Sequence, residues 1–116
     1  MAMTDCLFCK IIAREIPGTI VAENEHAVAF RDIHPGAPTH VLVVPRKHFE
    51  NLSDAAADDA ELIGRVLLMA RDVAKKEGLE AKGYRIAINN GAGVGQSVFH
   101  LHVHLLGGRA MSWPPG

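Results

Sequence analysis

The sequence predicts an α+β fold in which one short and one long helix pack on a five-stranded antiparallel sheet. Five short runs of alternating or β-branched apolar residues indicate strands. One longer segment carries apolar residues at helical spacing. The order along the chain is short helix, strands, long helix, strands, whereas parallel βαβ units would alternate. This order favours helices laid on an antiparallel sheet.

The first half of the chain supplies the short helix and three strands. The predicted elements are a helix within residues 6–18 and strands at 19–23, 27–33 and 39–45. Pro17 and Gly18 end the helix. Residues 24–26 form the turn between the first two strands, and the sequence HPGAP breaks the pattern before the third, which ends at Pro45.

The second half begins with a long amphipathic helix. Ser53 is expected to be its N-cap and Gly78 its stop, with acidic residues near its start and two lysines in its last turn. The apolar residues at helical spacing are Leu62, Val66, Met69 and Val73. Two further strands are predicted at 84–91 and 97–108, and a proline-containing tail follows them.

Length and composition predict a single domain spanning residues 1–116. Hydrophobic residues make up 48% of the chain, enough for a core. The 12 basic and 13 acidic residues give a net charge of -1, without the basic surplus of a nucleic-acid-binding protein. No apolar run approaches the roughly 20 residues of a membrane span, and the first ten residues lack a signal-peptide pattern. A soluble, cytoplasmic protein is therefore expected.

Three of the 7 histidines, His100, His102 and His104, alternate along the last predicted strand. Alternation places them on one face, while Phe99, Leu101, Val103 and Leu105 form the core face. At roughly 3.3 Å per residue, His100 and His104 are about 13 Å apart, too far to share one metal ion. The three histidines therefore have at least two functions.

One of these functions is phosphate chemistry. Imidazole titrates near neutral pH and acts as a base, an acid or a nucleophile. Just upstream, Gly91, Gly93 and Gly95 free the backbone to turn its N–H groups toward an anion. A strand follows these glycines, which distinguishes them from a Rossmann fingerprint. Hairpin turns also contain such glycines, and a lone histidine is usually a solvated surface residue.

Cys6 and Cys9 form a C-x-x-C pair. In a reducing compartment this spacing indicates a metal site or a redox pair more often than a structural disulfide. The alternative is two cysteines that simply pack in the interior.

The segment HLHVHLL, residues 100–106, resembles the signature of the histidine triad family. Other segments resemble the Hint branch of that family, the purine nucleoside phosphoramidases: FRDI, APTHVLVVPRKH, GYRIAINNG, GQSVFHLHVHLLGGR and WPPG. The resemblance covers nearly the whole chain. It implies a histidine triad fold and a homodimer that pairs through the long helix and the strand at 84–91, giving a ten-stranded sheet.

The resemblance implies a covalent mechanism at His102. This histidine would attack the α-phosphorus of an adenosine phosphoramidate, the amine would leave, and water would then release AMP. The groups implied to assist are His104 at the phosphate, Ser97 near the leaving nitrogen, His40 beside the nucleophile, and the backbone N–H groups of Gly95 and Gln96. The other ring nitrogen of His102 needs an acceptor, expected to be a main-chain carbonyl, to fix its tautomer.

The resemblance also implies a nucleotide site. Asp32 would accept hydrogen bonds from the ribose, and Asn89 would reach the sugar or phosphate. The apolar slot for a purine would be formed by Phe8, Ile11, Phe30 and Ile33. Trp113, in the tail, would reach the partner's site. The alternatives are core packing for the apolar residues, a turn cap for Asp32 and a frayed terminus for the tail.

Relatives with a C-x-x-C pair near the N-terminus use it with two histidines to hold zinc. The matching residues are Cys6, Cys9, His48 and His100, a closed Cys₂His₂ set typical of structural zinc. His100 would serve the metal, while His102 and His104 serve the phosphate. Reduced free thiols are the alternative.

Three functions remain open at this point. The first is a phosphoramidase that binds purine nucleotides such as AMP, adenosine phosphoramidates or aminoacyl adenylates. The second is a hydrolase of dinucleoside polyphosphates, and the third is a non-enzymatic nucleotide-binding partner protein. The segments at 96–109 and 113–116 favour the first.

Overall fold

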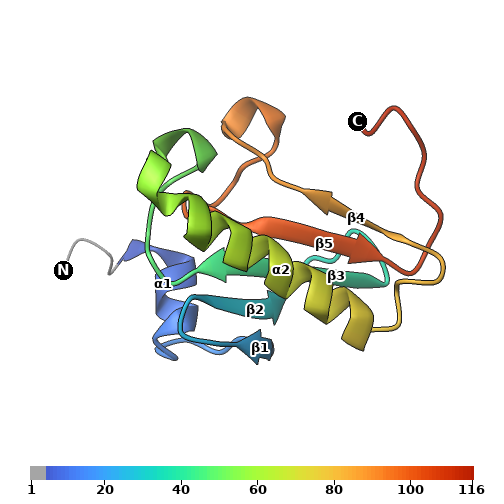
Figure 1. The fold of residues 1–116 in the computed structure, drawn as a ribbon, viewed down its shortest axis with the longest axis horizontal. Coiled ribbons are helices and arrows are strands. Elements are labelled where there is room, and N and C mark those ends of the chain that lie inside the picture. The colour runs from blue at the N-terminus through green and yellow to red at the C-terminus, as the bar shows by residue number, and fades with distance from the viewer. Residues whose placement is uncertain (1–4) are drawn as a thin grey trace.

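The structure, a computed structural model, describes residues 5–116. Residues 1–4, which belong to the segment without a signal-peptide pattern, lie outside the described residues. The described part contains two α-helices and five strands (Figure 1): α1 (Leu7–Ile12), β1 (Ile20–Glu23), β2 (Ala27–Arg31), β3 (Thr39–Pro45), α2 (Ala60–Lys76), β4 (Tyr84–Ala87) and β5 (Val103–Gly107). Short 3-10 helices are η2 (Leu52–Asp54), η3 (Ala57–Asp59) and η4 (Ala92–Val94). The predicted α+β fold is confirmed.

The five strands form one sheet in the order β1-β2-β3-β5-β4, and every neighbouring pair is antiparallel. Figure 1 shows α2 running across one face of this sheet. The strand from the C-terminal half, β5, lies beside β3, with Leu42 opposite His104 and Val41 opposite Leu105. This register points Leu105 toward α2 and His104 toward the other face.

Each face of the sheet has its own core. On one face, residues such as Val43, Val103 and Leu105 pack against the buried side of α2. On the other, Phe8 and Ile11 of α1 pack against a small group from β2 and β3: Val28, Phe30, Leu42 and Val44. Six residues are far fewer than the about 12 to 15 that an isolated helix needs. The position of α1 therefore depends on these contacts and on its two cysteines.

The predicted start of the long helix is wrong. α2 begins at Ala60, because residues 52–59 form two 3-10 turns. The carboxylate of Asp59 accepts the Ala56 N–H at 2.8 Å and pairs with Lys47 at 2.6 Å. Ser53, the predicted N-cap, instead donates its N–H to the Asn90 side chain. The predicted stop is correct, since Gly78 follows the helix with a φ of 76°.

The ends of three strands also differ from the prediction. β5 begins at Val103, because the preceding residues bend and place His100 in the cysteine–histidine cluster described below. Phe99 is consequently 45% exposed and does not join the core, whereas Leu101, Val103 and Leu105 are buried as predicted. β2 ends at Arg31, which forms a two-bond ion pair with Glu77 at the end of α2, and β4 ends at Ala87.

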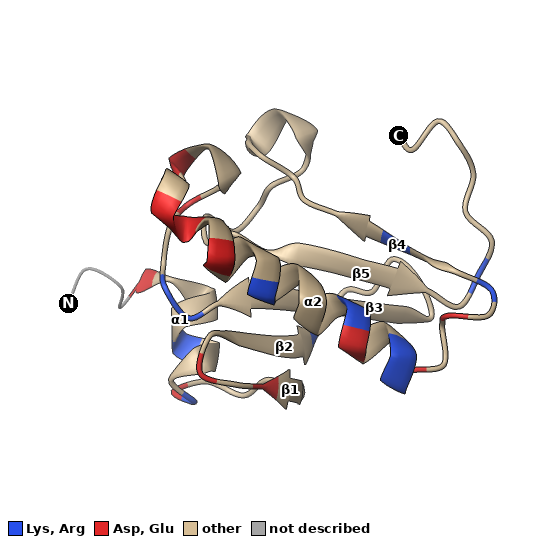
Figure 2. Cartoon of the chain, viewed as in Figure 1, with Lys and Arg blue, Asp and Glu red and all other residues tan. Residues whose placement is uncertain are grey.

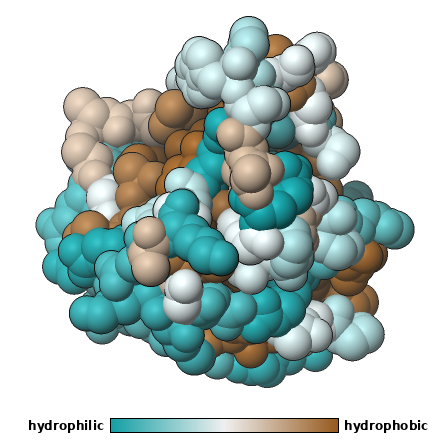
Figure 3. Space-filling model, turned by 90° about the vertical axis from the view of Figure 1, so that its right-hand side faces the viewer, coloured by the Kyte–Doolittle hydropathy of each residue, from teal (hydrophilic) through white to brown (hydrophobic). Residues whose placement is uncertain are grey.

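Charged side chains of both signs are distributed over the fold (Figure 2), with acidic residues near the start of α2 and lysines at its end. This arrangement complements the helix dipole. Seen from the end where α2 finishes, much of the surface is hydrophilic, and apolar residues gather at the upper left with smaller groups at the right and lower edges (Figure 3). Within residues 5–116, no helix has both the length and the apolar character needed to cross a membrane.

Candidate active site and metal site

A hollow of about 360 Å³ lies between α1 and the sheet face opposite α2. Its apolar side includes Leu7, Phe8, Ile11, Ile16, Phe30, Leu42 and Val98, and its polar side includes Asp32, Ser97, His102 and His104. Gly95 and Ile33 line it as well, although the Ile33 side chain is 82% exposed. The hollow thus brings together most of the residues that the sequence predicts to bind substrate.

His102 sits at the inner wall of this hollow and is only 5% exposed. Its Nδ1 lies 2.9 Å from the carbonyl oxygen of His100. A carbonyl only accepts hydrogen bonds, so Nδ1 carries the proton and Nε2 keeps its lone pair. The ring of Phe8 stands perpendicular to the imidazole at 5.0 Å and holds it from the side. The main-chain acceptor expected for this histidine is therefore present.

Burial lowers the pKa of His102, while the hydrogen bond to the His100 carbonyl and the charge of Asp32 raise it. Burial prevails, which keeps the ring neutral near pH 7. A neutral imidazole with a fixed tautomer and a free Nε2 is the form that attacks phosphorus.

His40 and His104 meet on neighbouring strands beside His102. His40 Nε2 is 2.9 Å from His104 Nδ1 and 3.4 Å from a carboxylate oxygen of Asp32. The Gly36 N–H donates to His40 Nδ1 at 2.9 Å. Asp32 also accepts the His34 N–H at 2.8 Å, so the turn-capping alternative is real, but its second oxygen still faces the histidines. The site is a compact polar cluster at the end of an apolar hollow.

Burial, followed by the neighbouring His102 and His40, lowers the pKa of His104 to about 4, although the charge of Asp32 raises it. The folded protein therefore keeps this ring neutral at pH values where the unfolded chain protonates it, so folding stability is complete above about pH 6.5 and falls toward pH 4. Between pH 7.5 and 5, we expect His104 to account for about 1 to 2 kcal/mol of the loss.

Urea unfolding at the two pH values tests this expectation. His104→Asn keeps an acceptor for His40 but cannot titrate, so its stability should depend less on pH than that of the parent. His26→Asn, in the turn before β2, is the control and should retain the parent's pH dependence. Equal pH slopes for the parent and His104→Asn would contradict the expectation.

A second cluster joins the N-cap and first turn of α1 to residues that follow β3 and precede β5. It consists of Cys6, Cys9, His48 and His100, whose ligand atoms all lie within 4.8 Å of one another. The Sγ atoms are 3.4 to 3.5 Å from the histidine Nδ1 atoms, and the two Nδ1 atoms are 3.0 Å apart. Tetrahedral zinc with ordinary bond lengths needs ligand atoms roughly 3.3 to 3.8 Å apart. The sulfur–nitrogen distances lie in this range and the two Nδ1 atoms are slightly closer, so the donor atoms fit such a metal.

The orientation of His100 fits a metal ligand too. Its Nε2 lies 2.8 Å from the Pro45 carbonyl oxygen and therefore carries the proton, which leaves the Nδ1 lone pair facing the two sulfurs. Burial, together with a hydrogen bond to Cys6 and the charge of Cys6, raises the pKa of Cys9 to about 11. A bound divalent cation would instead favour the thiolate.

Three predicted site residues have other surroundings than expected. The N–H groups of Gly95 and Gln96 donate to Ala92 and Gly91 within their own loop, and the buried Gln96 side chain bonds to backbone groups. Both amides are thus engaged within the loop, and their role at a phosphate stays a prediction; Gly95 and Ser97 line the hollow. Trp113 is 78% exposed and stacks on Arg85, away from its own chain's hollow.

Asn89 lies beside the loop, with its amide nitrogen 3.6 Å from the position of a Cβ on Gly95, but it does not line the hollow. Leu42, Val98 and the Gly36 amide are site groups that were not predicted from the sequence. Alternation along β3 places Leu42 on the same face as His40 and was a usable signal. A backbone amide from a loop leaves no such signal in the sequence.

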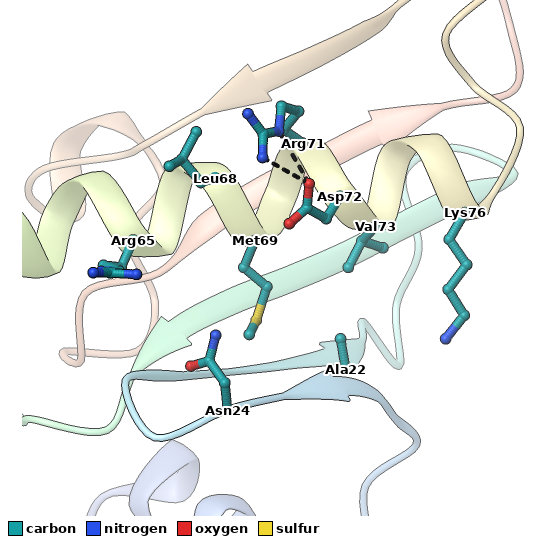
Figure 4. A pocket seen from close by; sticks show the side chains of 9 residues that line it. All are labelled: Ala22, Asn24, Arg65, Leu68, Met69, Arg71, Asp72, Val73 and Lys76. Carbon is teal, nitrogen blue, oxygen red and sulfur yellow. Dashed lines mark hydrogen bonds and ion pairs between the residues drawn. The ribbon is translucent and has the colours of Figure 1, made fainter.

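Another hollow, of about 320 Å³, lies between α2 and β1 on the opposite face of the sheet (Figure 4). Arg71 pairs with Asp72, and Lys76 donates to the Val21 carbonyl oxygen at 2.9 Å. Its lining contains no histidine or cysteine. The groups capable of nucleophilic chemistry at phosphorus therefore gather on the face that carries α1.

Known proteins that are similar to this chain in sequence and in fold belong to one family. The HIT domain family matches residues 13–111. An uncharacterized HIT-like protein of Synechocystis sp. is 53% identical over 112 residues, 97% of each chain. The 14 kDa zinc-binding protein of Zea mays is 53% identical over 112 residues, 95% of this chain and 87% of that protein.

Among solved structures, the crystal structure of a HIT family hydrolase from Legionella pneumophila has a TM-score of 0.94 at 52% identity and covers 97% of this chain and 100% of that one. The two chains therefore share one fold. The chain belongs to the HIT domain family.

Proposed function

We propose that this protein is a hydrolase that cleaves the P–N bond of purine nucleoside 5′-phosphoramidates through a nucleotidyl group on His102. The observation that carries the proposal is that Nε2 of His102 has a free lone pair at the wall of the hollow. The ring is neutral, and its hydrogen bond to the His100 carbonyl fixes the tautomer. The similarity to HIT family hydrolases supports the reaction class.

The hollow suits a nucleotide. Its apolar side, between Phe8 and Phe30, would take the purine, because a flat ring gains most from aromatic and aliphatic walls. Asp32 would accept hydrogen bonds from the ribose hydroxyls with the lone pairs that remain after its bond to the His34 amide. The phosphate would then lie beside His102 and His104.

The chemistry proceeds in two displacements. The Nε2 lone pair of His102 forms a bond to the α-phosphorus while the P–N bond breaks, and the amine leaves with the electron pair of that bond. The Ser97 hydroxyl, which borders the hollow, passes a proton to the departing nitrogen. Water then attacks the phosphorus and gives up a proton, which restores the Ser97 hydroxyl. The bond between phosphorus and His102 Nε2 breaks, its electron pair returns to Nε2 and AMP leaves. The positive charge on the nucleotidylated ring is stabilised by its Nδ1–H bond to the His100 carbonyl.

A comparison of substrates separates this function from its main alternative, the hydrolysis of dinucleoside polyphosphates. We expect kcat/KM for an adenosine phosphoramidate to exceed that for diadenosine polyphosphates by roughly tenfold or more, about 1.4 kcal/mol of transition-state free energy. A higher kcat/KM for the polyphosphates would reverse this assignment. Nucleotide binding without turnover of either class would support the non-enzymatic alternative.

Zinc is the proposed occupant of the Cys6–Cys9–His48–His100 cluster. The donor set, its spacing and the identity to a protein named for zinc binding support this assignment. The metal would be structural, because four protein ligands close the tetrahedron. Protein purified without chelator should hold about one zinc per chain, and less than about half an equivalent together with two titratable thiols would contradict the proposal.

A homodimer is proposed through β4 and α2. β4 is an edge strand, and large apolar side chains stand exposed on it and on α2: Leu67, Leu68, Tyr84 and Ile86. An unpaired edge beside an apolar surface favours pairing with a second copy, which would extend the sheet to ten strands. A monomeric mass in solution at micromolar concentration would contradict this.

A further inference from the structure

We propose that the Gly36 amide, acting through His40, sets the tautomer of His104 so that His104 presents an N–H to the nucleotide's phosphate. Gly36 and Arg109 are then positioning residues, since they act through the histidines and do not touch substrate. The identity of the acceptor rests on the proposed function, whereas the tautomers follow from hydrogen-bond partners alone.

The first step is the bond between Gly36 and His40. A backbone N–H only donates, and it lies 2.9 Å from His40 Nδ1. That nitrogen therefore carries a lone pair, and the proton of the neutral ring is on Nε2. A ring protonated on both nitrogens would oppose the Gly36 amide with its own N–H. His40 is therefore fixed as a donor through Nε2.

The second step is the bond between His40 and His104, which determines which ring nitrogen of His104 carries the proton. The Nε2–H of His40 faces two acceptors, His104 Nδ1 at 2.9 Å and an Asp32 oxygen at 3.4 Å. His104 Nδ1 is consequently an acceptor without a proton, and His104 carries its proton on Nε2. Burial lowers the pKa of both histidines, which agrees with two neutral rings.

The third step concerns where the resulting donor points. Among residues 5–116, His104 Nε2 is the one buried side-chain nitrogen or oxygen without a hydrogen-bond partner, and His104 lines the hollow. A buried donor without a partner costs about 1 to 3 kcal/mol, which a ligand acceptor recovers. A phosphate oxygen beside His102 is such an acceptor. The reverse tautomer would present a lone pair to the same anion and repel it.

The loop that carries Gly36 is tied down from its other side. The Arg109 guanidinium, just beyond β5, donates to the Gly36 carbonyl oxygen at 2.8 Å. The peptide that follows Gly36 is thus fixed to the strand that supplies His104. Arg109 keeps the loop at the distance at which its amide reaches His40.

Nitrogen-15 NMR of the histidine rings tests the inference directly on the whole protein. In the parent, His40 and His104 should each show a protonated Nε2 and a proton-free Nδ1. Gly36→Pro removes the donor, so both rings should show mixed tautomers and kcat/KM should fall roughly tenfold or more. Gly36→Ala is the matched control, because it keeps the amide and its Cβ would lie 3.8 Å from His40 Nδ1, an ordinary contact. It should retain the parent's tautomers and activity.

A protonated Nδ1 on His104 in the parent, or parent-like tautomers in a folded Gly36→Pro, would overturn the inference. If Gly36→Pro does not fold, Arg109→Met provides the second variant. It loses the bond to the Gly36 carbonyl and should shift part of the His104 population to the other tautomer; no shift would count against the role of Arg109. Failure of the proposed function would instead appear as an absence of nucleotide on His102, with the His104 tautomer unchanged.

Discussion

His102→Asn is expected to lower kcat/KM for an adenosine phosphoramidate by about 10⁴-fold or more. The substitution removes the only nitrogen lone pair that His102 presents to the hollow, while the asparagine amide can still donate to the His100 carbonyl in place of Nδ1. The backbone before β5 should therefore keep its conformation. Steady-state kinetics on the purified variant measures the loss.

Two controls separate lost chemistry from lost structure. His26→Asn changes a histidine in the turn before β2 and should leave kcat/KM unchanged. Calorimetric titration of His102→Asn with AMP should give an affinity within a few-fold of the parent, because the purine and ribose contacts remain. Turnover of phosphoramidate by His102→Asn at the parent's rate would show that another group is the nucleophile.

Cys9→Ser is expected to lower the melting temperature by about 10 °C or more, because it removes a ligand of the proposed zinc and with it the proposed tie between α1 and the sheet. α1 has only six residues and buries only Phe8 and Ile11, so little else holds it. Phe8 also packs against the His102 ring, at 5.0 Å between centroids. We therefore expect AMP affinity to fall roughly tenfold together with stability.

Scanning calorimetry with and without a strong chelator measures this effect. The chelator should lower the melting temperature of the parent and leave that of Cys9→Ser nearly unchanged. Ser97→Ala is the matched control, since Ser97 lines the same hollow without belonging to the cluster, and the variant should keep the parent's response to chelator. A parent that melts at the same temperature with and without chelator, at the same temperature as Cys9→Ser, would contradict the metal's structural role.

The sequence predicts this fold well where local pattern and tertiary structure agree. The apolar spacing in α2 and the alternating strands predicted both the elements and the α+β class. The start of α2 was misplaced, because Ser53 looks like an N-cap locally, while Asp59 is held by Lys47, a contact between residues 12 positions apart. The early end of β2 similarly depends on a long-range ion pair between Arg31 and Glu77.

The candidate site was predictable where chemistry limited the choice. The spacing along the strand predicted that His100 and His104 cannot bind the same metal ion. The structure places His100 with the cysteines and His104 in the hollow. The loop amides were not predictable in the same way. Whether the N–H of Gly95 or Gly36 faces inward depends on turn geometry, and only the second reaches a histidine. The position of Trp113 relative to a partner's hollow likewise stays a prediction.

Mass spectrometry of protein quenched during turnover tests the nucleotidyl-histidine mechanism most directly. With an adenosine phosphoramidate as substrate, we expect one AMP per active chain, attached to the peptide that contains His102, and none in His102→Asn. Fragmentation should locate the group on that imidazole rather than on His100 or His104. Rapid release of AMP with no nucleotide on His102 at any quench time, or a nucleotide on a different residue, would contradict the mechanism.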